Sequence, residues 1–95
     1  MIIQDIQHAS DKQSRRDGRY PQRIGCKVDL CQPPHPGTSA IFNYLKDNEG
    51  KPKSGYLVTS IVQQYEETST HIQLITLNSI YLLRKEPTDT FTGVI

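Results

Sequence analysis

Residues 71–84 read HIQLITLNSIYLLR and consist of two short runs of apolar and β-branched residues on either side of Leu77-Asn78. Ile, Thr and Tyr are common in strands, and Asn accepts the left-handed backbone conformation that a tight turn or a bulge requires. The segment therefore predicts two strands, 71–76 and 79–84, joined at Leu77-Asn78.

Three further strand-like runs precede this pair, at 24–30, 39–46 and 55–64. The first alternates apolar and polar residues, as a half-buried strand does, and the second places alternate apolar residues on one face. The third is rich in β-branched residues and reads as a central strand that is covered on both faces for part of its length. The segments between the runs carry turn chemistry: QPPHPG at 32–37, DNEGKPKSG at 47–55 and YEETST at 65–70.

These runs predict a mostly β fold, in which five short antiparallel strands form a small barrel or a curled meander of the SH3-like or OB-like kind. The predicted domain covers residues 24–86, between a polar, arginine-rich and irregular N-terminal arm at 1–23 and a C-terminal tail at 87–95. The isoleucines at positions 2, 3 and 6 are spaced as in a single helical turn, which would dock on the domain.

The arm carries an excess of positive charge. Residues 1–23 contain five basic and three acidic side chains, whereas residues 24–95 contain six basic and seven acidic ones. Four of the basic residues are arginines between positions 15 and 23, and a planar guanidinium can hold phosphate or carboxylate through two hydrogen bonds. A solvated, partly disordered arm would have the same composition.

Length and composition exclude several classes of protein. The chain has 95 residues, 35% of them hydrophobic and 22% charged, and a formal net charge of +1. This length leaves room for one domain with a small core, and no stretch approaches the roughly 20 apolar residues of a membrane helix. Because the first residues also lack the apolar core of a secretory signal, we expect a cytoplasmic protein rather than a membrane protein, a multidomain enzyme or a strongly basic nucleic-acid coat.

Residues suited to catalysis or metal binding do not form a recognisable motif. The chain lacks a G-x-S-x-G elbow, an H-E-x-x-H pair and a glycine-rich phosphate loop. Cys26 and Cys31 lie five positions apart, so in one strand they would point to opposite faces, and we expect two reduced thiols. Nothing in the spacing favours a pairing of either cysteine with His71. We therefore expect neither an enzyme nor a metal or cofactor site.

Three polar clusters are better candidates for binding. The first comprises Asp17, Arg19, Tyr20 and Arg23, just before the first predicted strand. Tyr20 precedes Pro21, which favours an extended backbone, and an aromatic ring between two guanidiniums suits a ligand with a π-face and phosphates. Alternatively, Tyr20 packs on the barrel and the arginines pair with acidic side chains.

The second cluster is Thr59-Ser60, where strand alternation puts one hydroxyl on each face of the sheet. The third lies in TLNSIY and consists of Thr76, Asn78, Ser79 and Tyr81. Asn78 offers a donor and an acceptor together, as recognition of a base edge or a carbonyl requires. The alternatives are hydroxyls satisfied by the backbone and an Asn required by a turn. The clusters would form one site if strand pairing brought Thr59 near Asn78.

Three blocks of the sequence, DGRYPQRIG at 17–25, GYLVTSIV at 55–62 and TLNSIYLL at 76–83, together resemble small proteins of phages and mobile elements in Firmicutes. Small phage proteins of this kind often counter host defence. The chain is similar in size and in its β-rich core to one such group, the Thoeris anti-defence sponges, which bind cyclic ADP-ribose signals. The resemblance implies that the arginine–tyrosine segment and the T-x-N-S segment line a signal pocket.

The residues and the resemblance together predict a non-enzymatic protein that antagonises host defence by sequestering a cyclic nucleotide. Arg19 and Arg23 would hold phosphate, Tyr20 would stack on a base, and Asn78 with Thr76 would read polar edges. Because a small domain gains stability by association, we also expect a homo-oligomer. The alternatives are a protein-binding inhibitor of a host defence effector such as a CRISPR nuclease, a small nucleic-acid-binding β-barrel module, and a structural or assembly protein of a phage particle.

Overall fold

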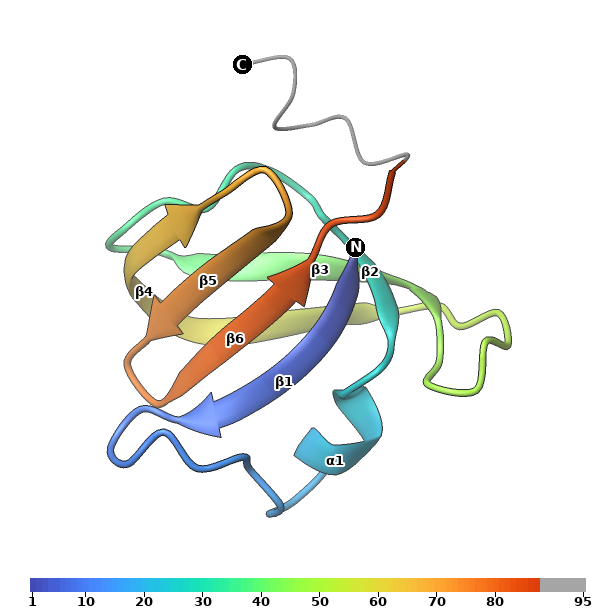
Figure 1. Cartoon of the computed structure of the whole chain (residues 1–95), viewed down its shortest axis with the longest axis horizontal. Helices are drawn as coiled ribbons and strands as arrows, with labels where there is room; N and C mark the ends of the chain where they lie inside the picture. The colour runs from blue at the N-terminus through green and yellow to red at the C-terminus, as the bar shows by residue number, and fades with distance from the viewer. Residues whose placement is uncertain (88–95) are drawn as a thin grey trace.

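The computed structural model describes residues 1–87. Within this part of the chain, six strands and one short helix follow in the order β1 (Ile2–His8), α1 (Tyr20–Arg23), β2 (Lys27–Leu30), β3 (Ser39–Lys46), β4 (Tyr56–Glu67), β5 (His71–Thr76) and β6 (Ser79–Arg84). Successive strands pair antiparallel, and β1 also pairs with β6, so that the sheet closes on itself (Figure 1). The predicted mostly β, antiparallel fold is confirmed, with six strands in place of five.

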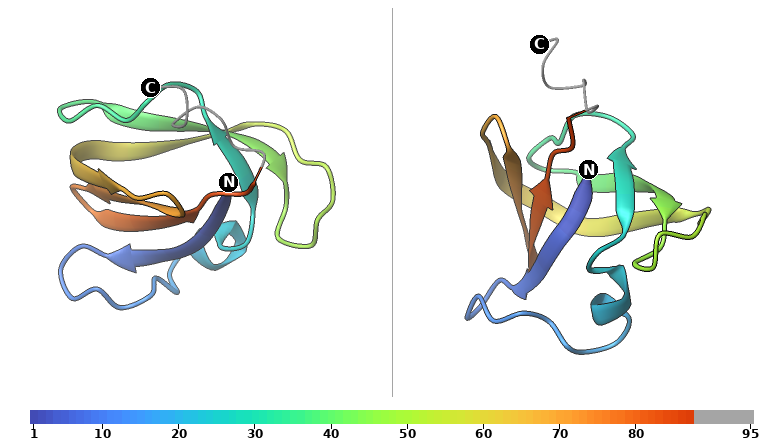
Figure 2. Two further views of the ribbon diagram at one scale, coloured as in Figure 1. Left: turned by 45° about the horizontal axis from the view of Figure 1, so that its top comes forward. Right: turned by 45° about the vertical axis from the view of Figure 1, so that its right-hand side comes forward.

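The hairpin of β5 and β6 forms where the sequence predicts it, with Ile75 opposite Ile80 and Leu77-Asn78 between the strands. The preceding strand, β4, pairs with β3 through its first half and with β5 through its second half. A register shift between Val62 and Gln64 lies close to the point where the pairing changes, and such bulges bend a strand and increase its twist. The resulting curvature of the sheet can be followed in Figure 2.

The prediction of an irregular arm is wrong at its start, because residues 2–8 form β1. Ile3 and Ile6 are both fully buried, although strict alternation would put side chains three positions apart on opposite faces. A bulge between Ile3 and Asp5 adds one residue to β1 opposite β6, and the extra residue returns Ile6 to the inner face. A spacing that fits a helical turn therefore belongs to a bulged strand.

The prediction of an extended Tyr20 is also wrong, because Tyr20 begins α1. Pro21 falls in the first turn of this helix. N–H groups in the first turn have no acceptor within a helix, so a proline, which lacks an N–H, costs no hydrogen bond there. The Ile24 N–H donates to the Tyr20 carbonyl at 3.3 Å, and Gly25 then turns the chain with a φ of 95°. As a result, β2 begins at Lys27 and not at residue 24.

The core lies inside the closed sheet and receives fully buried side chains from every strand, among them Ile3, Ile6, Val28, Phe42, Val62, Leu74 and Leu83. The rings of Phe42 and Tyr81 pack with 6.0 Å between their centroids. In β4 only one face is covered, contrary to the prediction, since Tyr56, Val58 and Ile61 are exposed on the other. This strand also continues to Glu67, so the turn predicted at 65–70 is shorter.

Three smaller points complete the description of residues 1–87. Cys26 is buried, Cys31 is exposed, and both are free thiols. No helix in this part of the chain has the length and apolar character to cross a membrane. The tail predicted at 87–95 lies, except for Pro87, outside the described residues.

Replacement of Ile6 by Ala tests whether β1 belongs to the folded domain. We expect Ile6→Ala to lower the free energy of unfolding by about 2–5 kcal/mol, because it leaves a cavity in a closed core. The control is Leu77→Ala, at a side chain that is 63% exposed, where the change should stay within about 0.5 kcal/mol. Urea unfolding followed by circular dichroism measures both, and equal midpoints would show that β1 adds nothing to the fold.

Candidate binding site

The second and third polar clusters meet at the turn between β5 and β6. The Ser60 hydroxyl donates to Thr76 Oγ1 at 2.9 Å and accepts the Asn78 N–H at 3.2 Å. Thr76 Oγ1 in turn donates to the Ser79 carbonyl at 2.8 Å and accepts the Ser79 N–H at 3.1 Å. Because Thr76 and Ser79 are buried, these hydrogen bonds hold the turn and leave the Thr76 hydroxyl no opening to a ligand.

Thr59 and Ser60 point to opposite faces of β4, as predicted, with Thr59 buried and Ser60 partly exposed. Thr59 Oγ1 accepts the Ala40 N–H at 3.0 Å and donates to the Ser60 carbonyl at 2.7 Å. The first of these bonds joins β4 to β3 where the register of the two strands shifts, and the second lies within β4. The Thr59 side chain is therefore part of the sheet and not of a binding surface.

Arg15 connects the β5–β6 turn with the first cluster. Its Nη1 atom donates to Ser79 Oγ at 2.7 Å and to the Asn78 carbonyl at 3.3 Å. Its Nε and Nη2 atoms donate to the two carboxylate oxygens of Asp17 at 3.1 and 2.7 Å. The guanidinium carbon also lies 4.1 Å from the centre of the Tyr20 ring. Arg15 is not among the residues predicted for the site, yet it joins two of the predicted clusters.

Tyr20 and Tyr81 are both occupied by contacts within the protein. Besides the Arg15 guanidinium, the Arg23 guanidinium also lies over the Tyr20 ring, 5.1 Å from its centre. The ring itself packs against the core. Tyr81 is buried, and burial raises the pKa of its hydroxyl to about 12. The packing of Tyr20 agrees with the alternative given above, but the acidic side chain of the cluster, Asp17, pairs with Arg15 and not with Arg19 or Arg23 as that alternative expected.

Arg19 and Arg23 line a pocket of about 260 Å³ between α1 and the loop at 47–55, which joins β3 to β4. Lys53 contributes a third cation from that loop, and Tyr44 and Tyr56 also line the pocket. Among the described residues, no acidic side chain lines it. We call this feature the cationic pocket, and three cations without acidic neighbours in its lining attract anions.

The loop at 47–55 is held in shape by hydrogen bonds to Asp47. One carboxylate oxygen accepts the N–H groups of Glu49 and Lys51, each at 2.9 Å, and these bonds lower the pKa of Asp47. The Lys53 N–H donates to the Leu45 carbonyl at 3.1 Å. The loop therefore presents Lys53 from a segment that several backbone hydrogen bonds hold in one conformation.

The two walls of the cationic pocket contact each other beside α1. A Cβ atom placed on Gly25 would lie only 3.2 Å from Asn48 Cβ, so the loop packs closely on the second residue after the helix. The Cys26 thiol donates to the Gln22 carbonyl at 3.4 Å on the other wall. Burial raises the pKa of Cys26, which disfavours the thiolate that a nucleophile requires. Cys26 thus acts as packing for the pocket.

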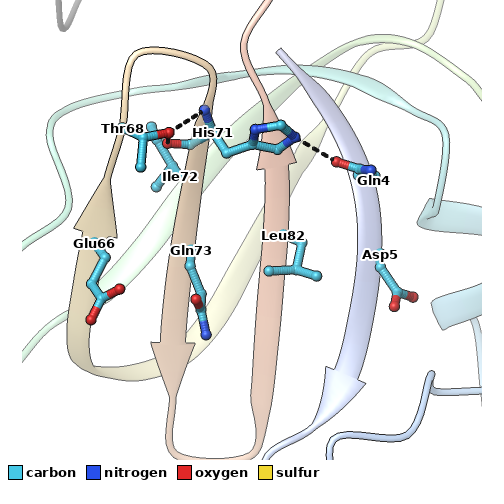
Figure 3. A pocket seen from close by; sticks show the side chains of 8 residues that line it. All are labelled: Gln4, Asp5, Glu66, Thr68, His71, Ile72, Gln73 and Leu82. Carbon is cyan, nitrogen blue, oxygen red and sulfur yellow. Dashed lines mark hydrogen bonds between the residues drawn. The ribbon is translucent and has the colours of Figure 1, made fainter.

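A larger hollow of about 520 Å³ lies on the outer face of the sheet (Figure 3). Its floor and sides are a row across four strands, formed by Glu66, Gln73, Leu82 and Asp5. His71 Nε2 and Gln4 Oε1 lie 3.0 Å apart at one end, where they bridge β5 and β1. The row was not predicted, because polar residues on a wet strand face have no distinctive spacing.

Sequence reasoning also missed three residues that line the cationic pocket or support it: Arg15, Lys53 and Tyr56. Arg15 belongs to the arginine run, so the signal for it was present. Lys53 and Tyr56 lie in KPKSGY, where a basic residue close to an aromatic one is a weak signal. Their meeting with Arg19 and Arg23 depends on contacts between segments about 30 residues apart, which no local pattern records.

Among residues 1–87, no group of three His, Cys, Asp or Glu side chains is placed to hold a metal ion. No protein-family model, curated protein or solved structure matches the chain. The resemblance to phage and mobile-element proteins therefore stays a prediction, and the cationic pocket is the feature of the molecule that points to a function.

Acidification should weaken the Arg15–Asp17 pair. A hydrogen bond from Arg15 lowers the pKa of the Asp17 carboxyl from 3.8 to about 2. A lowered pKa means that the carboxylate stabilises the folded state above about pH 4, and that this contribution is lost as the pH falls through about 2. We expect Asp17→Asn to reduce the drop in melting temperature between pH 5 and pH 2, measured by circular dichroism. Asp29→Asn, at another exposed carboxylate, is the control, and an unchanged drop in Asp17→Asn would contradict the expectation.

Proposed function

We propose that the protein is a non-enzymatic binding protein that sequesters a small phosphate-bearing ligand, and that this ligand is a cyclic nucleotide that serves as an immune signal. The observation that carries this proposal is the cationic pocket, in which Arg19, Arg23 and Lys53 meet without an acidic side chain among the described lining residues. In the setting that the sequence resemblance suggests, a phage or mobile element would use such a protein in the cytoplasm of its bacterial host to suppress defence.

The chemistry of the three cations suits phosphate. Each guanidinium offers a planar pair of donors for two phosphate oxygens, and the Lys53 ammonium adds a charge that can approach from a different direction. Arg19 is exposed and extends from the start of α1, whereas Arg23 is partly covered by its contact with Tyr20. A phosphate in the pocket would replace water around these groups and be held by charge-assisted hydrogen bonds.

Sequestration fits the pocket better than turnover of a ligand. Cys26 and Ser54 both line it, but burial favours the neutral thiol of Cys26, and no histidine or carboxylate among the described lining residues could activate the Ser54 hydroxyl. Thr76 and Ser79 are committed to the β5–β6 turn. A protein that removes a signal needs affinity and abundance only, and a pocket of fixed cations supplies affinity.

Thermal shift measurements test the proposed ligand class. We expect cyclic ADP-ribose isomers or cyclic oligonucleotides to raise the melting temperature, since a ligand at 100 times its Kd adds about 2.7 kcal/mol to stability. Arg19→Ala and Lys53→Ala should each weaken binding by about 10- to 150-fold, the range expected for a lost hydrogen bond to a charged group. Lys51→Ala is the matched control, because Lys51 lies in the same loop and pairs with Glu49. No shift with any nucleotide would reject the proposal.

A second candidate function, inhibition of a host defence protein by direct contact, is favoured by a different surface. Ile41, Val58, Ile61 and Leu77 are exposed on the outer face of β3 and β4 and beside the β5–β6 turn, with Ile41 directly opposite Val58. We call these four residues the apolar strip. Clustered exposed apolar groups are typical of protein–protein contacts, and in the proposed homo-oligomer a second copy of the chain would cover the apolar strip.

Val58→Asp tests the apolar strip without disturbing the core, because Val58 is 60% exposed. We expect this change to abolish self-association in light scattering and co-purification with a defence effector such as a CRISPR nuclease. Gln63→Asp, on the exposed part of the same strand, is the control for added charge. A wild-type protein that is monomeric in light scattering and co-purifies with no effector would show that the apolar strip is not an interface. The same conclusion would follow if Val58→Asp and Gln63→Asp both behaved as wild type does.

A further inference from the structure

We infer that Tyr56, and not Tyr20, is the aromatic platform on which the base of a nucleotide stacks while its phosphate lies among Arg19, Arg23 and Lys53. The inference rests on the proposed function, because it concerns the ligand of the same cationic pocket. It restricts that ligand to an anion with an aromatic base attached, and it assigns the base to a residue outside the predicted binding clusters.

Three tyrosines lie close to the cations of the pocket, and their surroundings differ. Tyr20 has two guanidiniums over its ring, at 4.1 and 5.1 Å from the centroid. Tyr44 is buried, with the Lys53 ammonium 4.8 Å from its ring centre. Tyr56 lines the pocket and is 68% exposed. Of these three rings, Tyr56 alone offers a broad open face to a ligand.

The backbone fixes Tyr56 beside the pocket. It is the first residue of β4 and lies opposite Asn43 of β3. The Gly55 carbonyl just before it accepts the Tyr44 N–H at 2.9 Å, and Gly55 itself has a φ of 111°, which L-residues rarely adopt. The ring is therefore attached to a strand that is already paired, and little backbone ordering is required when a base stacks on it.

The neighbours of Tyr56 on the outer face suit a base as well. Val58 follows two positions along the same face, and Ile41 lies opposite Val58, so an apolar surface continues from the ring away from the cations. Asn43 is the direct cross-strand neighbour of Tyr56, and such pairs have Cβ atoms about 5 Å apart. Its amide supplies a donor and an acceptor for a base edge, the role that the sequence suggested for Asn78.

Titration calorimetry with inorganic phosphate, adenosine, AMP and ADP tests the inference. We expect wild type to bind AMP about 5- to 150-fold more tightly than inorganic phosphate, the range that stacking of one base supplies. Tyr56→Ala should remove this advantage and leave the affinity for inorganic phosphate unchanged, whereas Tyr56→Phe should retain it. Adenosine should bind weakly, because it lacks the phosphate.

Tyr20→Leu, which removes the other ring beside the arginines, is the control and should keep the advantage of AMP over inorganic phosphate. Proton NMR provides a readout that a structural effect would not imitate. The ring-proton signals of Tyr56 are assigned as those that the spectrum of Tyr56→Phe lacks. Upfield shifts of these signals on addition of AMP would support stacking. Equal affinities for AMP and phosphate, or an AMP affinity that Tyr56→Ala leaves unchanged, would overturn the inference while the proposed phosphate pocket stands. Failure of every phosphate compound to bind wild type would overturn both.

Discussion

The pairing of β1 with β6 closes the sheet, and the positions of the candidate binding residues follow from that closure. It sets His8, at the end of β1, opposite Ser79 at the β5–β6 turn. The chain then folds back along β1, where the Arg15 N–H donates to the Ile6 carbonyl at 2.7 Å. This return brings the Arg15 side chain to the turn and places α1 beside the loop at 47–55. Burial of Ile3 and Ile6 stabilises the arrangement from the inside.

Arg15 and Arg19 belong to one arginine run but have different roles. The Arg15 guanidinium is committed to the Asp17 carboxylate, the Ser79 hydroxyl and the Tyr20 ring. A carboxylate of the same segment thus offsets one positive charge, while Arg19 and Arg23 line the cationic pocket with Lys53. The surplus positive charge of residues 1–23 is therefore divided between a structural contact and a surface that attracts anions.

The sequence predicts the hairpin and β3 well, because alternation with a period of two is a local property that needs no knowledge of partners. It fails for β1, where a bulge breaks the period and Ile3 and Ile6 mimic a helical spacing. For the pocket, the arginines could be predicted from their clustering and their residue type. Lys53 and Tyr56 could not, because the packing of Asn48 on Gly25 brings their loop to α1.

The cationic pocket is built mainly from α1 and the loop at 47–55, whereas the core is built from the inner faces of the strands. Loops tolerate substitution and insertion far better than buried strands do. A lineage of such proteins can therefore diversify the ligands it recognises by changing the pocket walls, with the buried framework inherited unaltered. Gly25 and Gly55 are exceptions, because their φ values of 95° and 111° disfavour any side chain, and a Cβ on Gly25 would also lie only 3.2 Å from Asn48 Cβ.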